Sequence, residues 1–111
     1  MTQYAVLIFE RAQELPAEVL DAHGALPGRI AAEGGRVVAG LALHRGETAT
    51  AIRGDLITDG PFIETKEGLA GLFVLEARDL DHALALAKMT PVVDGGVEVR
   101  PLLGFQILER S

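Results

Sequence analysis

Cysteine is absent from the sequence, and serine occurs only once, at Ser111. Without cysteine the chain cannot form disulfides, and it offers neither a thiolate nucleophile nor a cysteine-based zinc site. Because Ser111 is the only serine, the sequence also offers no plausible serine catalytic triad. The absence of disulfides agrees with a cytoplasmic location, which we expect for this protein.

Long apolar runs and basic clusters are also missing. No apolar run approaches the roughly 20 residues of a transmembrane helix, and residues 1–4 lack the basic segment that begins a signal peptide. Ten basic residues are scattered among 16 acidic ones, for a net charge of −6. Nucleic-acid-binding proteins carry a basic face. We therefore expect neither a membrane nor a nucleic-acid partner.

Motifs for metals and phosphates are absent as well. The three histidines, His23, His44 and His82, lie far apart, and no His-x-x-x-His or Glu-x-x-His pair occurs. The glycines do not form a phosphate-binding loop. The sequence predicts no metal site and no cofactor, and we expect no functional role for His44, beside a hairpin turn, or for His82.

Apolar residues, by contrast, are plentiful. They make up 49% of the 111 residues, and the mean hydropathy is +0.27. The length suits a single domain over residues 1–111. For a small protein this composition is rich, so we expect part of the apolar surface to meet a partner.

Short apolar segments predict five strands. They cover residues 4–9, 36–43, 48–53, 70–77 and 97–102. Residues 56–58 are expected to extend the third strand past a kink at Gly54 and Asp55. Residues 105–108 are expected to add a short edge strand.

The first of two predicted helices opens at Leu15 and Pro16, since proline suits a first turn. Its apolar face comprises Leu15, Val19, Ala22, Leu26 and Ile30. Pro27 predicts a kink or a break near Ala25, because proline removes a helical hydrogen bond. The glycine pair at 34–35 is expected to end the helix.

The second helix begins after Asp79, whose carboxylate can cap its first turn, and ends before Pro91. Its apolar side is expected to comprise Leu80, Ala83, Leu84 and Ala87. The resulting order, βαββ followed by βαβ, predicts an α+β protein, a sandwich of a mainly antiparallel sheet and two main helices.

Both faces of the predicted strands are apolar. An antiparallel sheet with one solvated face would show alternation, yet residues 70–75 are apolar nearly throughout, and residues 4–9 and 37–43 behave likewise. Two helices cover only one face of a sheet. A second copy of the same sheet is the simplest cover for the other face, so we predict a homodimer with sheet packed on sheet.

Residues 59–67 form a charged segment between two apolar strands. They combine a turn former, a proline, a phenylalanine and four charges, whereas a plain strand connection needs only a few residues. Charged loops on a rigid scaffold usually carry function. The string DGPF at 59–62, followed by ETKE at 64–67, closely resembles the signature of the DGPF proteins, a branch of the YCII-related family.

Two further segments resemble the same family. Residues 79–83 are similar to the acidic start of its second helix, and residues 95–101 to its closing strand. The resemblance covers nearly the whole chain and implies a ferredoxin-like fold that dimerises as an α+β barrel. Enzymes of that architecture often bind small organic molecules between helices and sheet, some without a cofactor. DGPF proteins are also associated with extracytoplasmic-function sigma factors, which implies a sigma factor as a partner.

The wider YCII-related family carries a histidine on its first helix and an aspartate in or near the sheet, proposed as a catalytic pair. His23 lies near the matching place. Because residues 36–43 contain no aspartate, Asp59 would be the acidic partner. Other interpretations stay open: Asp59 bonds the backbone two residues on in a turn, and His23 is a satisfied residue at the core boundary.

Four more residues are candidates for ligand contacts. Lys66 holds an anionic substrate as a point charge, or pairs with Glu67 in a solvated loop. Phe62 packs into the core or the dimer seam, or stacks on a ligand. Arg100 forms a buried pair with a carboxylate such as that of Glu98, or binds an anion.

Three functional hypotheses follow. In the first, the protein is a small dimeric enzyme with a pocket between the first helix, the sheet and loop 59–67. His23 and Asp59 would transfer protons on a small carbonyl compound, and Lys66 or Arg100 would neutralise an anionic intermediate. In the second, it is a non-catalytic ligand-binding or regulatory module whose loop contacts a partner such as a sigma factor. In the third, it is a structural dimer whose loop locks the seam.

Overall fold

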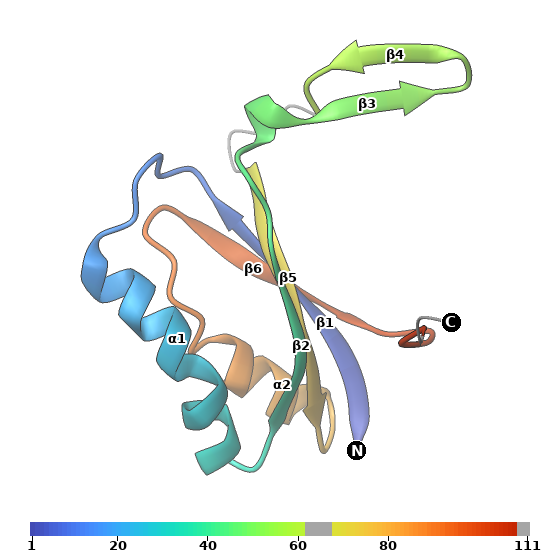
Figure 1. Cartoon of the computed structure of the whole chain (residues 1–111). Helices are drawn as coiled ribbons and strands as arrows, with labels where there is room; N and C mark the ends of the chain where they lie inside the picture. The colour runs from blue at the N-terminus through green and yellow to red at the C-terminus, as the bar shows by residue number, and fades with distance from the viewer. Residues whose placement is uncertain (62–67, 109–111) are drawn as a thin grey trace.

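The chain forms two layers, a four-stranded sheet with two helices on one of its faces (Figure 1). The computed structural model describes residues 1–61 and 68–108. In spatial order, the strands of this sheet are β2 (Arg36–Ala42), β5 (Gly68–Ala77), β1 (Thr2–Glu10) and β6 (Gly95–Pro101). All neighbouring strands run antiparallel, so the predicted α+β class with a ferredoxin-like arrangement is confirmed.

The predicted edge strand at residues 105–108 is wrong, because these residues form no strand. β6 pairs with β1, and the pairing places Pro101 opposite Tyr4. A chain that continues beyond Pro101 soon runs past Thr2, where β1 begins. It therefore has no strand left to pair with.

Helix α1 (Ala17–Ala32) continues through Pro27, so of the predicted kink or break near Ala25, the break is wrong. Pro27 has no N–H to donate to the carbonyl group of His23, four residues earlier. Leu26 and Ile30, on either side of this gap, are buried in the core. Burial of two large aliphatic side chains offsets the loss of one hydrogen bond.

Helix α2 (Leu80–Ala87) begins with the predicted cap, since the Asp79 carboxylate accepts a hydrogen bond of 2.9 Å from the backbone N–H of His82. Its buried side comprises His82, Ala83, Leu86 and Ala87. The predicted face is right for the two alanines and wrong for Leu80 and Leu84, which are exposed. The helix instead turns the side that bears His82 toward the end of α1.

The core lies between the sheet and the helices. Its buried members are Tyr4, Val6, Leu26, Ile30, Phe73, Leu75, Ala77, Ala83, Leu86 and Ala87. The predicted face of α1 supplies two of them, Leu26 and Ile30. Because strand residues alternate between faces, the core takes every second residue of β1 and β5 and leaves the others on the far side.

The far side of the sheet carries a row of leucines. Leu7 of β1 lies opposite Leu72 of β5, which in turn lies opposite Leu41 of β2. Directly opposed residues share a face, and Leu7 follows the core residue Val6, so the row points away from the helices. We call this the leucine face. Neither α1 nor α2 covers the leucine face (Figure 1), as expected from strands that are apolar on both sides. The second copy that would cover this face remains a prediction.

The connection from β2 to β5 forms an arm that projects from the end of the sheet (Figure 1). It contains the short helix η1 (Gly46–Thr48) and the hairpin strands β3 (Thr50–Arg53) and β4 (Leu56–Asp59). The predicted extension of the third strand is wrong, because the chain reverses at Gly54 and Asp55. Gly54 has a φ of 58°, which suits the first position of a two-residue hairpin turn. Ile52 and Ile57 face each other across the hairpin, and both are more than half exposed.

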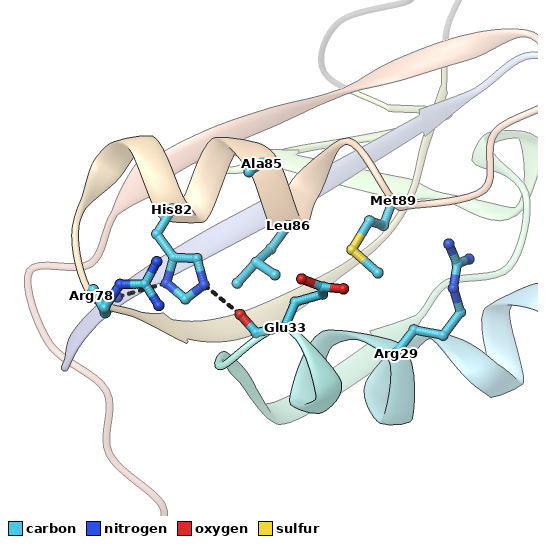
Figure 2. A pocket seen from close by; sticks show the side chains of 7 residues that line it. All are labelled: Arg29, Glu33, Arg78, His82, Ala85, Leu86 and Met89. Atoms are coloured by element: carbon cyan, nitrogen blue, oxygen red, sulfur yellow. Dashed lines mark hydrogen bonds between the residues drawn. The ribbon is translucent and has the colours of Figure 1, made fainter.

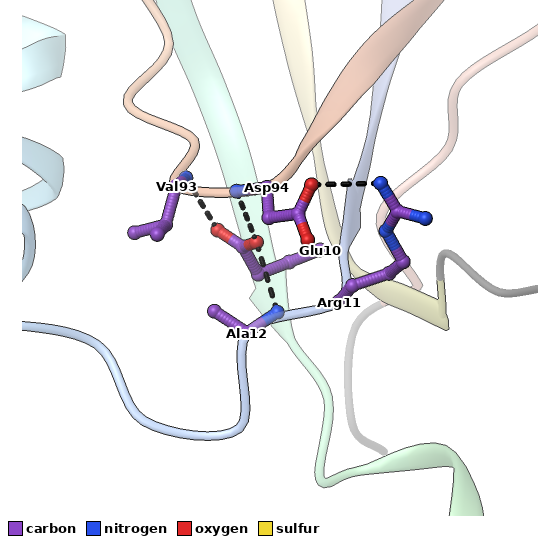
Figure 3. A network of polar contacts seen from close by, with 5 residues as sticks. All are labelled: Glu10, Arg11, Ala12, Val93 and Asp94. Atoms are coloured by element: carbon purple, nitrogen blue, oxygen red, sulfur yellow. Dashed lines mark hydrogen bonds and ion pairs between the residues drawn. The ribbon is translucent and has the colours of Figure 1, made fainter.

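Glu10, at the end of β1, holds the segment that leads into β6 (Figure 3). Its carboxylate accepts hydrogen bonds from the backbone N–H groups of Val93 (2.7 Å), Asp94 (2.8 Å) and Ala12 (3.2 Å). The adjacent Arg11 forms an ion pair of 2.8 Å with Asp94. Burial raises the pKa of Glu10, but the backbone donors together outweigh it, so this pKa lies below its ordinary value of 4.5.

Replacing Glu10 by glutamine should make the free energy of unfolding less dependent on pH in acid. A carboxyl group whose pKa is lowered by folding stabilises the protein fully above its unfolded pKa, and this contribution is lost as the pH falls through the folded pKa. We expect the wild type to be more stable than Glu10→Gln at pH 7, and the difference to be smaller at a pH below 4.5, the ordinary pKa of this carboxyl group. Urea unfolding at both pH values measures this, and an equal difference at the two would contradict it.

Candidate functional site

A cavity of about 520 Å³ opens between the end of α1 and α2 (Figure 2). Its lining comprises Arg29, Glu33, Arg78, His82, Ala85, Leu86 and Met89. Arg29 and Glu33 lie at the end of α1, Arg78 precedes α2, and Met89 follows it. The volume is within the range of small-molecule sites. The pocket predicted beside loop 59–67 is a different place and stays a prediction, because residues 62–67 lie outside the described residues.

His82 joins the two helices at the back of this cavity. Its side chain is buried, and its Nδ1 accepts a hydrogen bond of 3.1 Å from the backbone N–H of Arg78. Its Nε2 lies 2.8 Å from the carbonyl oxygen of Glu33, to which it donates when Nδ1 is the acceptor. Both ring nitrogens are thereby used in the fold. His82 is a structural link and is poorly suited to take a proton from a ligand.

His23 lies half-buried on α1, three residues before the core residue Leu26. Residues three apart on a helix share a side, so His23 lies toward the side of α1 that bears Leu26. Among the described residues, none forms a hydrogen bond or ion pair with this ring. His23 therefore differs from His82, because no described contact occupies its nitrogens.

Asp59 lies at the end of β4 on the arm and is exposed. The structure does not bring it to His23 within one chain, since α1 belongs to the helix layer and β4 to the arm (Figure 1). The alternative turn, in which Asp59 bonds the backbone two residues on, has no donor, because Pro61 lacks an N–H. The N–H of Gly60 donates instead to the carbonyl group of Ala49 at 2.7 Å. The proton-transfer pair itself stays a prediction.

The remaining candidates from the sequence are Phe62, Lys66, Glu67 and Arg100. Phe62, Lys66 and Glu67 lie outside the described residues, so their roles stay predictions. Arg100, on β6, donates through its Nε to the carboxylate of Glu98, the partner that the sequence predicted. The pair is not buried, however, because the two side chains are 69% and 46% exposed. An exposed pair of this kind adds little stability.

The cavity residues were not among the sequence candidates, although their spacing contains a signal. Arg29 and Glu33 are four residues apart on one helix, and so are Arg78 and His82 at the start of the other. Such pairs lie on one side of a helix or its cap. What the spacing cannot show is that the two pairs meet, because this depends on how α1 and α2 pack.

The structure shows no further candidate centre in the ranges 1–61 and 68–108. No three side chains of His, Asp or Glu gather there as possible ligands of a metal ion. No helix in these ranges is long and apolar enough to cross a membrane.

An antiparallel sheet in the order β2-β5-β1-β6, with two helices on one face and a ligand-sized cavity between them, defines a small ferredoxin-like α+β protein. The YCII-related domain matches residues 2–106, and the chain belongs to the YCII-related family. An uncharacterised protein of Rhizobium meliloti (strain 1021) is 42% identical over 50 residues, which make up 42% of this chain and 40% of that protein. The similarity thus spans less than half the length of that relative.

Proposed function

We propose that this YCII-related protein is a homodimeric enzyme of the DGPF branch that transfers a proton on a small anionic or carbonyl compound, with His23 as the catalytic residue. One observation carries the proposal: His23 is half-buried on α1, yet among the described residues none forms a hydrogen bond or ion pair with its ring. A ring placed in this way is available to a ligand, whereas His82 is not. Imidazole groups in general exchange protons near neutral pH.

In this proposal Asp59 of the second copy is the acidic partner, and Lys66 neutralises negative charge on the ligand. Arg100 lies opposite Ala5, on the leucine face rather than the helix side of the sheet, and takes no part beside His23. The position of the loop's end supports a site near α1. Gly68, where the described chain resumes, lies opposite Glu10. The segment that leads to α1 leaves the sheet from this same end, so its first residues are neighbours of Gly68.

Replacing His23 by glutamine should reduce turnover by about 100-fold or more, the usual contribution of a general acid or base. The measurement is turnover across a panel of small carbonyl and anionic metabolites, with Asp59→Asn as the second variant. His44→Gln is the matched control, since His44 is an exposed histidine next to the arm, and it should retain full activity. Equal turnover by the wild type and His23→Gln would rule out this mechanism.

The exposed arm favours a second candidate, a non-catalytic regulatory module that contacts a partner such as a sigma factor. An isolated two-stranded hairpin is only marginally stable in water, and Ile52 and Ile57 leave an apolar pair uncovered. This candidate predicts no turnover on the panel. It also predicts binding of a purified extracytoplasmic-function sigma factor, which Ile52→Ser would abolish. Both candidates place the protein in the cytoplasm.

A further inference from the structure

Charges of both signs surround the cavity between α1 and α2. Figure 2 shows the Glu33 carboxylate near Met89, with Arg29 on one side of it and Arg78 at the opposite end. None of the three charged side chains forms an ion pair with another described residue. Arg29 precedes Glu33 by four residues, and this order of charges along a helix is the less favourable one for pairing.

The charged side chains around the cavity favour a cationic group at one position and anionic groups at two others. Glu33 is the C-cap of α1, where the last carbonyl groups of the helix add partial negative charge. An ammonium group is therefore favoured beside it. Arg29 and Arg78 each present a guanidinium group, which suits a carboxylate. The three side chains carry a net charge of +1, so a ligand with one ammonium group and two carboxylates balances them.

The floor of the cavity is apolar. Ala85 and Leu86 come from α2, and Met89 follows the helix. Leu86 is 2% exposed and belongs to the core, so it forms a fixed surface. Met89 has a flexible thioether side chain that adapts to the shape of a ligand. Such a floor accommodates a short chain of methylene groups between the polar ends of a ligand.

From this arrangement we propose that the cavity binds a free acidic α-amino acid. Glu33 contacts its ammonium group, Arg29 its α-carboxylate and Arg78 its side-chain carboxylate, while its methylene groups lie against Leu86 and Met89. His82 holds the two helices, and with them these three charges, at a set separation. This site is separate from His23, and its occupation does not depend on catalysis there.

The two methionines of the chain provide the test. Met89 lines the cavity, whereas Met1 is 68% exposed and is not part of the lining. In protein labelled with ¹³C at the methionine methyl groups, titration with L-glutamate should move the Met89 signal saturably at millimolar concentrations. The Met1 signal should stay in place. A Met89 signal that glutamate does not move would overturn the proposal.

Matched ligands separate the three contacts. L-Leucine lacks the second carboxylate and glutarate lacks the ammonium group, so each should bind about five-fold more weakly than glutamate, the effect of one exposed ion pair. Arg78→Gln should weaken glutamate binding about five-fold and leave leucine binding unchanged. Glu33→Gln should make glutarate bind as tightly as glutamate. Arg45→Gln, at an exposed arginine outside the cavity, should change nothing, and equal binding of glutarate and glutamate by the wild type would overturn the proposal.

Discussion

Alanine in place of Gly95 should lower the free energy of unfolding by about 3 kcal/mol or more, and the melting temperature by roughly 12–24 °C. A Cβ atom at Gly95 would lie 1.9 Å from the carbonyl oxygen of Phe9 and 2.8 Å from its carbonyl carbon. These are backbone atoms of β1, which cannot rotate away as a flexible side chain would. Relief requires β6 to separate from β1 at the point where Gly95 pairs with Glu10.

The neighbouring glycine provides the control for this experiment. A Cβ atom at Gly96 would have no atom within 4 Å, so Gly96→Ala should shift the melting temperature only slightly. Both substitutions lie on β6, and both remove the conformational freedom of a glycine from the unfolded chain. Thermal unfolding followed by circular dichroism compares them. Similar melting temperatures for the two variants would show that the close approach of β1 and β6 is not what requires glycine at position 95.

Glutamate in place of Leu72 should convert the predicted homodimer into monomers. Leu72 is the middle member of the leucine row, between Leu7 and Leu41. A sheet-on-sheet dimer would bury this row at its centre, and a carboxylate there would lose its water without gaining a partner. We expect the dimer dissociation constant to rise about 100-fold or more, an effect typical of central interface positions. Sedimentation equilibrium of the wild type and the variant measures it.

Two further variants distinguish dissociation from unfolding. Leu41 is 55% exposed in the single chain, so Leu41→Glu should weaken the dimer while leaving the fold intact. Leu80 is similarly exposed, at 48%, but lies on α2 in the helix layer, and Leu80→Glu should leave the dimer unchanged. A wild-type protein that sediments as a single copy at micromolar concentration would contradict the homodimer.

Local sequence preferences predicted most of the secondary structure. The apolar run near Tyr4 became β1, and the carboxylate of Asp79 caps α2 as expected. Gly34 ends α1 with a φ of 85°, a conformation that side chains disfavour. These features depend on residues within a few positions of one another, so the sequence contains the relevant information directly.

The predictions that failed depend on contacts between distant residues. Pro27 would interrupt an isolated helix, but α1 continues because Leu26 and Ile30 pack into a core shared with the sheet. Residues 56–58 continue the third strand in the sequence, yet in the structure the chain turns back at Gly54 to form the arm. The exposure of Arg100 likewise follows from its place on a strand at the edge of the sheet.

By itself, the sequence determined the class of fold, the apolar character of both faces of the sheet and the position of the charged loop, because periodicity and turn residues act over short distances. Only the tertiary structure decided that His82 links the helices while the ring of His23 has no described partner. It also placed the charges of α1 and α2 around one cavity. The contact between His82 and Glu33 joins residues 49 positions apart, and no local pattern specifies which of many such pairs the packed core will bring together.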